Sequence, residues 1–194
     1  ATNLVTGIAD AQIDSTPMVC ITGQVGKHLL GSDAFQETDI IGISTPVTKW
    51  NYQITEAHEI PEIMAKAFYI ARSGRPGPVL IDITKNAQFD EFEFSYEKCT
   101  AIRSYHPKPI LQQDKVAQAA ELINSAKKPF IIFGQGIILS EAEAELKALV
   151  AVLDQPPHIF VVSDEIYEHI NFSDKHCSIA SIGNMIERTI TVNG

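Results

Sequence analysis

Residues 74–83 read GRPGPVLIDI, and this stretch decides the fold. Two glycines and two prolines within five residues cannot stay helical, so the stretch opens with a turn. The apolar run Val79–Ile83 then has the length and composition of a buried β-strand. Before the turn, residues 60–73 carry apolar side chains at helical spacing. A helix that leads through a turn into a buried strand is typical of an α/β protein with a parallel sheet.

The same alternation continues on both sides of this stretch. Further strands are predicted at 18–22 (MVCIT), 129–133, 158–165 and 189–192, and further helices at 113–125 and from a capping box of Ser140 and Glu143 through Val150. We therefore predict parallel sheets covered by helices. The irregular, acidic and aromatic text between them predicts an interdomain linker at 89–109.

Composition excludes several classes of protein. With 45% hydrophobic and 20% charged residues among 194, the chain has the balance of a globular protein with a core. The formal net charge of -9 and the lack of a basic run speak against a nucleic-acid partner. Three cysteines far apart, no signal peptide and no apolar run of membrane-spanning length predict a cytoplasmic protein without a membrane partner. Because the chain lacks an initiator Met, we expect it to be cut from a longer one.

Three motifs carry a family resemblance. They are ATNLVTGIADAQIDSTPMVCITGQV (1–25), GSDAFQETDIIGISTPVTKW (31–50) and GRPGPVLIDITKNAQ (74–88). Together they resemble the pyrimidine-binding domain of the acetolactate synthase large subunit, a thiamine-diphosphate enzyme. The resemblance implies that residues 1–88 are a partial domain of this kind. It also implies that the glutamate that activates the thiamine aminopyrimidine lies upstream of Ala1.

The resemblance assigns site residues in this domain. Asn3 matches the asparagine beside the aminopyrimidine ring, Phe35 and Gln36 match the pair that lines the reaction centre, and Lys85 matches a lysine at the mouth of the substrate channel. The sequence departs from the family near Lys85, where it reads ITKNAQ instead of the usual IPKD. The residue types alone leave alternatives open. Phe35 could fill the core, Gln36 could be an amide on a helix surface, and Lys85 could be a solvated charge.

A second unit is predicted to begin near residue 110. KKPFIIFGQG (127–136) resembles the start of the family's central, Rossmann-like domain, so residues 110–150 are assigned to it. In the family this region helps to hold FAD, which implies that Gly134, Gln135 and Gly136 bind the cofactor and that Arg75 reaches the same flavin. The alternative is a tight strand-to-helix turn without a ligand.

Residues 151–194 resemble a different family. The segment SDEIYEHINF (163–172) resembles the aspartate-class aminotransferases of fold type I. By that resemblance, Asp164 would pair with the pyridinium nitrogen of pyridoxal phosphate and Tyr167 would hydrogen-bond its phenolic oxygen. The alternatives are a helix N-cap for Asp164 and ordinary packing for Tyr167. His169, His176 and Cys177 fit no standard metal site, so no metal site is predicted.

These expectations define three hypotheses of different classes. The first is a fragment of acetolactate synthase, whose thiamine diphosphate and Mg²⁺ condense pyruvate with a second 2-keto acid in branched-chain amino acid biosynthesis. We expect such a fragment to be inactive alone, because the diphosphate-binding domain lies outside it, and to form a homo-oligomer that a regulatory small subunit could join. The second is a fragment of a pyridoxal-phosphate aminotransferase. The third is a non-catalytic scaffold, with two pieces joined near Val150.

Overall fold

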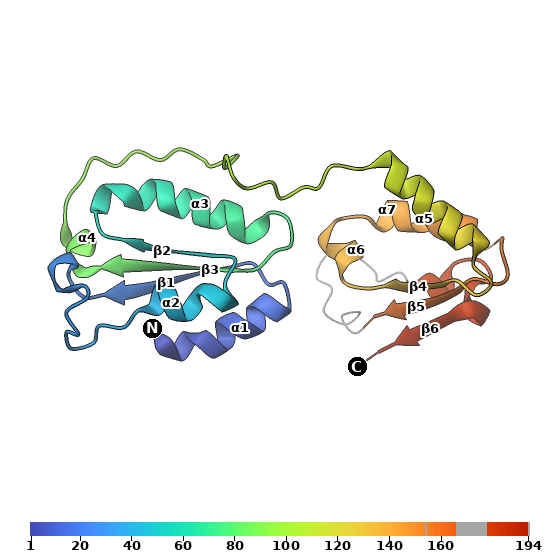
Figure 1. The fold of residues 1–194 in the computed structure, drawn as a ribbon, viewed down its shortest axis with the longest axis horizontal. Coiled ribbons are helices and arrows are strands. Elements are labelled where there is room, and N and C mark those ends of the chain that lie inside the picture. The colour runs from blue at the N-terminus through green and yellow to red at the C-terminus, as the bar shows by residue number, and fades with distance from the viewer. Residues whose placement is uncertain (154, 166–177, 194) are drawn as a thin grey trace. The chain divides into compact units, whose positions relative to one another are not determined.

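The computed structural model describes residues 1–153, 155–165 and 178–193. They form two compact units, Ala1–Pro109 and Ile110–Gly194, and each contains its own three-stranded sheet (Figure 1). All strand pairings in both sheets are parallel. The prediction of parallel sheets covered by helices is therefore confirmed. Within the described ranges, no helix combines the length and the apolar character needed to cross a membrane.

The sheet of the first unit has its most buried strand in the middle. β3 (Pro78–Thr84) lies between β1 (Met18–Gln24) and β2 (Trp50–Ile54). Every residue of β3 except Ile83 is buried, which explains why its sequence is an almost continuous apolar run. The strands predicted at 18–22 and 79–83 are both present.

Helices flank this sheet. They are α1 (Val5–Ile13), α2 (Ile40–Ser44), α3 (Ile60–Arg72) and α4 (Lys85–Phe89), with 3-10 turns η1 (Thr2–Leu4), η2 (Lys27–Leu29), η3 (Thr45–Val47) and η4 (Ala57–Glu59). The predicted helix at 60–73 is α3, which ends one residue earlier. The sequence analysis did not predict α1, α2 or β2.

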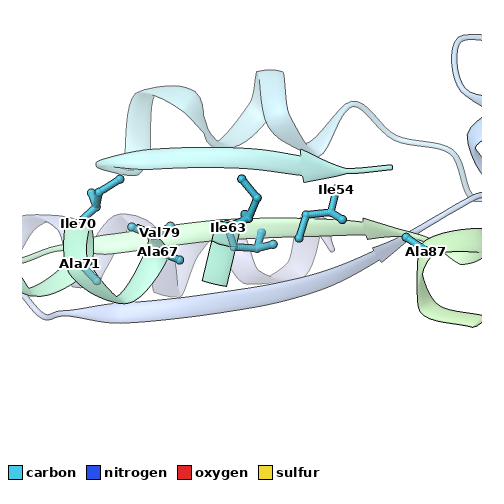
Figure 2. Close-up of a cluster of buried hydrophobic side chains, with 8 residues drawn as sticks. Ile54, Ile63, Ala67, Ile70, Ala71, Val79 and Ala87 are labelled. Carbon is cyan, nitrogen blue, oxygen red and sulfur yellow. The ribbon is translucent and has the colours of Figure 1, made fainter. Parts of the chain in front are cut away.

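Alternate side chains of β3 enter two separate cores. Val79 and Ile81 pack with Ile54 of β2 and with the apolar side of α3, which presents Ile63, Ala67, Ile70 and Ala71 (Figure 2). Leu80 points to the other face of the sheet, where it packs with Cys20, Ile8 of α1 and Ile40 of α2. A strand that is buried on both faces fixes its register strongly, because a slip by one residue would exchange the two cores.

The predicted linker is anchored at its far end. Residues 90–98 are exposed, but the Tyr105 hydroxyl donates a 2.9 Å hydrogen bond to the Ser73 carbonyl oxygen just after α3. The Tyr105 and Tyr69 rings meet edge to face at 6.2 Å. Gly74 has φ of 61°, and a Cβ there would lie 3.1 Å from the Pro107 carbonyl oxygen, so glycine fits this crossing. Residues through Pro109 accordingly belong to the first unit.

The second unit is built around a smaller sheet. Its elements are α5 (Gln113–Ser125), β4 (Phe130–Phe133), α6 (Gly136–Leu139), α7 (Glu143–Leu153), β5 (Phe160–Asp164), η5 (Ile179–Ser181), η6 (Met185–Arg188) and β6 (Thr189–Val192). The strand order is β4-β5-β6. The strands and the helix at 113–125 lie where the sequence predicts them. The predicted capping box does not form, because α7 begins at Glu143 itself and Ser140 is the C-cap of α6, where its hydroxyl donates to the carbonyl oxygens of Gly136 (2.7 Å) and Ile137 (3.1 Å).

The structure differs from the predicted junction near Val150. Val150 lies inside α7 and is buried in one cluster with Val161, Ile179 and Met185. β5 pairs directly with β4, and β6 pairs with β5. Residues on both sides of Val150 therefore share one sheet and one core, and 151–194 is not a separate fragment in this structure. The physical reason is that β4 pairs with β5 and packs Phe133 into a core to which Val161, Ile179 and Met185 contribute from beyond Val150.

Candidate functional site

The predicted reaction-centre residues lie at the carboxyl edge of the first sheet. In a parallel sheet all strands end at the same edge, which is where α/β proteins commonly bind ligands. The segment after β1 contains Phe35 and Gln36, and Lys85 follows β3 directly. The Lys85 N–H lies 3.4 Å from the Val25 carbonyl oxygen. The structure thus brings Lys85 next to the start of the segment that carries Phe35 and Gln36.

Residues 30–38, called here the Phe35 loop, project from this edge. The Phe35 side chain is 90% exposed, so it does not fill the core. Gln36 is also exposed and lies in a loop with φ of 66°, not on a helix. The alternatives in which Phe35 fills the core and Gln36 lies on a helix surface are therefore wrong. Lys85 is exposed at the first position of α4, and its exposure fits both interpretations of that residue.

The Glu37 carboxylate folds this loop. It accepts hydrogen bonds from the N–H groups of Gly31 and Ala34, the latter at 2.9 Å. These bonds, from Gly31 first and Ala34 second, hold the pKa of Glu37 below its ordinary value. A carboxylate that closes a loop in this way fixes the backbone on both sides of Phe35 and Gln36.

A buried carboxylate beneath the edge was missed by the sequence analysis. Asp82 in β3 is fully buried. Its oxygens accept hydrogen bonds from the Thr22 hydroxyl (2.7 Å) and from the side-chain amides of Gln53 (3.0 Å) and Gln24 (3.2 Å). All three strands contribute. Near Asp82 the sheet is therefore held together by side-chain hydrogen bonds as well as by the backbone hydrogen bonds between its strands. The signal was present, because an aspartate inside the apolar run VLIDI must find partners when it is buried.

Gln24 connects this network to the Phe35 loop. Its side-chain nitrogen donates to the Thr38 carbonyl oxygen at 2.8 Å, as well as to Asp82. Its side-chain oxygen accepts from the Val25 N–H at 2.9 Å. Gln24 is the last residue of β1, so the strand end and the end of the loop are fixed to each other.

Polar contacts also join the segments that follow the three strands. The Lys27 N–H donates to the Asn86 side chain at 2.9 Å, and the Asn86 amide donates to the Thr55 carbonyl oxygen at 2.8 Å. Lys27 pairs with Glu56, and its hydrogen bond to that carboxylate raises the pKa of Lys27. Lys27 is thereby committed to an ion pair with Glu56, whereas the Lys85 side chain is exposed at this edge of the sheet.

The two other residues predicted for this unit, Asn3 and Arg75, make no described hydrogen bond to the Phe35 loop. Asn3 lies exposed in η1, and among the described residues no hydrogen bond joins it to the loop. Arg75 precedes β3, so it lies at the opposite edge of the sheet from Lys85. Its guanidinium donates to the Ser15 hydroxyl (2.8 Å) and to the Ile13 carbonyl oxygen (3.0 Å). Here Arg75 caps the C-terminal end of α1.

The predicted cofactor residues of the second unit lie at the carboxyl ends of β4 and β5. Gly134 follows β4, and a Cβ placed on it would be 3.9 Å from the Asp164 Cβ. The helix behind Gly134-Gln135-Gly136 is α6, which has only four residues. A helix of four residues provides few free N–H groups for the diphosphate of a flavin nucleotide, so the turn does not by itself indicate a flavin site.

The remaining predictions concern Tyr167 and a metal site. Tyr167, His169, His176 and Cys177 lie outside the described residues. Within the described residues, no group of three or more His, Cys, Asp or Glu side chains could hold a metal ion.

Comparison with protein families defines the class. Residues 1–43 match the N-terminal TPP binding domain of thiamine pyrophosphate enzymes, and residues 116–163 match the central domain of the same enzymes. The second match runs across Val150, as the sheet does. A solved structure of a protein described as thiamin diphosphate-dependent, from Mycobacterium smegmatis, superposes with a TM-score of 0.64 over 84% of this chain and 30% of that one. At 22% identity it supports the fold alone. The two units therefore have the fold of thiamine pyrophosphate enzyme domains.

Closer relatives specify the family. The acetolactate synthase large subunit of Corynebacterium glutamicum is 43% identical over 188 residues, which are 94% of this chain and 30% of the relative. The isozyme 1 large subunit of Escherichia coli is 48% identical over 142 residues, 73% of this chain and 25% of the relative. The homologues of this chain are acetolactate synthase large subunits, and it spans between a quarter and a third of their length. These matches do not show the resemblance of residues 151–194 to aminotransferases.

Proposed function

We propose that this chain supplies the pyrimidine-facing wall of a thiamine diphosphate site and part of the central domain in an acetolactate synthase. The reaction would join pyruvate to a second 2-keto acid. One observation carries the proposal. In a chain whose homologues are acetolactate synthase large subunits, the Phe35 loop presents Phe35 and Gln36 at the ligand-binding edge of a parallel sheet.

Each proposed site residue would have a role that suits the chemistry of its side chain. The exposed Phe35 ring gives an apolar wall against which the acceptor keto acid is oriented. The Gln36 amide can donate and accept hydrogen bonds without titrating, so it suits a centre where charge develops on a substrate oxygen. The Lys85 ammonium attracts the carboxylate of a 2-keto acid to this edge. Asn3 would hold the aminopyrimidine. Thiamine diphosphate, when bound, supplies the carbon nucleophile.

A hybrid enzyme tests the proposal. In the Corynebacterium glutamicum relative, the stretch that aligns with Ala1–Pro109 is replaced by these residues, which form one compact unit. We expect the hybrid to form acetolactate from pyruvate when thiamine diphosphate, Mg²⁺ and FAD are supplied. A hybrid that folds, as judged by circular dichroism and a cooperative melt, but that shows no turnover above a buffer blank would overturn the proposal.

FAD remains part of the proposal through the resemblance alone. The geometry at Gly134 does not favour a diphosphate, and Arg75 is engaged with α1. We therefore derive no step through a flavin. Flavin absorbance near 450 nm in the purified chain would support binding; a colourless sample after incubation with FAD would count against it.

Association is also proposed, with a second copy and with a regulatory small subunit. The relatives are described as large subunits, which implies a small one. In the second unit, the strand register places Phe130, Ile132, Phe160, Val162, Ile190 and Val192 on one face of the sheet. Most of these side chains are well exposed, Ile132 by 70%. An uncovered apolar face favours association, so light scattering should give a mass above that of a monomer. A stable monomer at high concentration would contradict this.

The aminotransferase alternative for residues 151–194 remains a prediction from the sequence. Asp164 ends β5 beside Gly134, and Tyr167 lies outside the described residues. No pyridoxal phosphate chemistry is proposed for them.

A further inference from the structure

The backbone of the Phe35 loop is held in an unfavourable conformation. Asp33 has φ of 55° and Gln36 has φ of 66°, which is the left-handed region that side chains other than glycine rarely adopt. Such conformations persist only where surrounding contacts over-determine them, and they cluster at functional sites. Two left-handed residues that flank Phe35 therefore require an explanation in side-chain contacts.

Glu37 supplies the first set of contacts. Its two carboxylate oxygens accept from the N–H groups of Gly31 and Ala34, so one side chain bridges the start and the end of the turn. The Glu37 N–H in turn donates to the Ala34 carbonyl oxygen at 2.9 Å. These bonds close the loop on itself and leave Phe35 and Gln36 outside the closure, facing solvent.

Gln24 supplies the second set, which attaches the closed loop to the sheet. Its amide nitrogen bridges the Thr38 carbonyl oxygen and the Asp82 carboxylate, at 2.8 and 3.2 Å. Asp82 cannot shift, because it is buried between strands and also accepts from Thr22 and Gln53. A hydrogen-bonded network that converges on a buried carboxyl group in this way is expected to be rigid.

We infer that Glu37 and Gln24 are positioning residues, which together hold Phe35 and Gln36 at a fixed height above the carboxyl edge of the sheet. The roles of Phe35 and Gln36 themselves rest on the proposed function. Neither Glu37 nor Gln24 contacts a substrate in this account. They act by fixing the backbone from which the two exposed side chains project.

Gln53 provides a matched control for Gln24. Both amides donate to the same Asp82 oxygen, but only Gln24 reaches the loop. The measurement is amide hydrogen exchange by mass spectrometry on the 194-residue chain, followed in peptides that cover the Phe35 loop and in peptides that cover β3. We expect Gln24→Ala to speed exchange in the loop about tenfold or more, and Gln53→Ala to change it less than about threefold, while both affect β3 alike.

Substitution of Glu37 gives a graded second test that leaves the buried network intact. Glu37→Ala removes both acceptors, whereas Glu37→Gln keeps one side-chain oxygen, so exchange in the loop should increase from wild type to Gln to Ala with β3 unchanged. Equal loop exchange in wild type, Gln24→Ala and Glu37→Ala would overturn the inference. So would a Gln53→Ala variant as fast as Gln24→Ala, because it would indicate a general loss of sheet stability.

The exchange measurement needs neither cofactor nor turnover. Its failure would leave the proposed function standing, and an inactive hybrid enzyme would leave the exchange result standing. The two can therefore fail separately.

Discussion

The Arg188 guanidinium donates a 2.7 Å hydrogen bond to the Pro156 carbonyl oxygen, and the same nitrogen lies 3.0 Å from the Leu153 carbonyl oxygen at the end of α7. Arg188 is the last residue of η6, immediately before β6. One side chain thus ties the end of α7, the helix that contains Val150, to the entry of β6.

This contact predicts a local loss of stability. Hydrogen bonds from a charged donor contribute about 1.5–3 kcal/mol, so Arg188→Met should destabilise the second unit by about 1–3 kcal/mol. The neighbouring exposed Glu187 offers a control, Glu187→Gln, which should have little effect. Amide hydrogen exchange at increasing denaturant concentration, measured in β5 and separately in β3, gives the unfolding free energy of each unit. Equal losses in both units would contradict the division of the chain.

Lys49 has a similar role in the first unit. Its ammonium donates to the Ile70 carbonyl oxygen and, at 2.7 Å, to the Ser73 carbonyl oxygen at the C-terminal end of α3. Lys49→Met would remove this donor from both carbonyls, although the Tyr105 hydroxyl would still donate to the Ser73 oxygen, and should lower stability by about 1–2 kcal/mol. Lys66→Met removes an exposed pair with Glu62 and should cost only about 0.3–0.5 kcal/mol. If both variants melt alike, Lys49 does not cap α3.

Glu59 predicts a loss of stability in acid. Burial alone would raise its pKa, but hydrogen bonds from the Tyr52 hydroxyl and from the N–H groups of Glu56 and Thr55 outweigh burial and lower the pKa. The unfolded chain therefore binds this proton more readily than the folded one. The stabilisation is complete above the ordinary value of about 4.3 and is lost as the pH falls through the lowered folded pKa.

The test compares melting temperatures over that acid range. Glu59→Gln should be less stable than wild type at neutral pH and should lose less stability on acidification. Glu91→Gln, in an exposed segment, should follow the wild-type curve. Parallel curves for wild type and Glu59→Gln would show that this carboxylate does not contribute.

The left-handed backbone of Gln36 predicts opposite effects of two substitutions. Glycine adopts φ of 66° without a steric penalty, so Gln36→Gly should keep the stability of the chain or raise it by up to about 1 kcal/mol. Gln36→Val places a β-branched side chain there and should lower stability by about 1 kcal/mol or more. Thermal melts decide between them, and a valine variant as stable as the glycine variant would contradict the observed loop conformation.

The parts of the fold that could be predicted are those that local sequence determines. β1 and β3 are apolar runs because each contributes to cores on both faces, and α3 has a regular apolar side. β2 was missed because its polar residues are used in the structure. Gln53 bonds Asp82, and the Asn51 amide donates to the Ile41 carbonyl oxygen at 2.7 Å. A strand whose polar residues bond to partners elsewhere in the chain cannot be recognised from its own sequence alone.

Non-local pairing explains the other differences. A resemblance over ten residues, SDEIYEHINF, suggested a separate fragment, but strand pairing with β4 places its first residues in the sheet of the second unit. In the site, the resemblance assigned Phe35, Gln36 and Lys85, and the structure places all three after strands, at the carboxyl edge of one sheet. The resemblance could not predict Gln24 and Glu37, because their roles depend on a loop conformation and on a buried carboxylate that lies 58 residues after Gln24 in the chain.

The kinetics of Gln36→Ala in the active hybrid enzyme, with Lys85→Ala beside it, test directly whether the Phe35 loop takes part in the reaction. Alanine leaves the left-handed backbone requirement of position 36 essentially as it is, so the change removes the amide without relieving strain. We predict that kcat/KM for pyruvate falls about tenfold or more, which corresponds to about 1.4 kcal/mol of transition-state stabilisation, while the melting temperature stays near that of the hybrid. Unchanged kinetics together with a lowered melting temperature would contradict the account, because Gln36 would then serve packing and not chemistry.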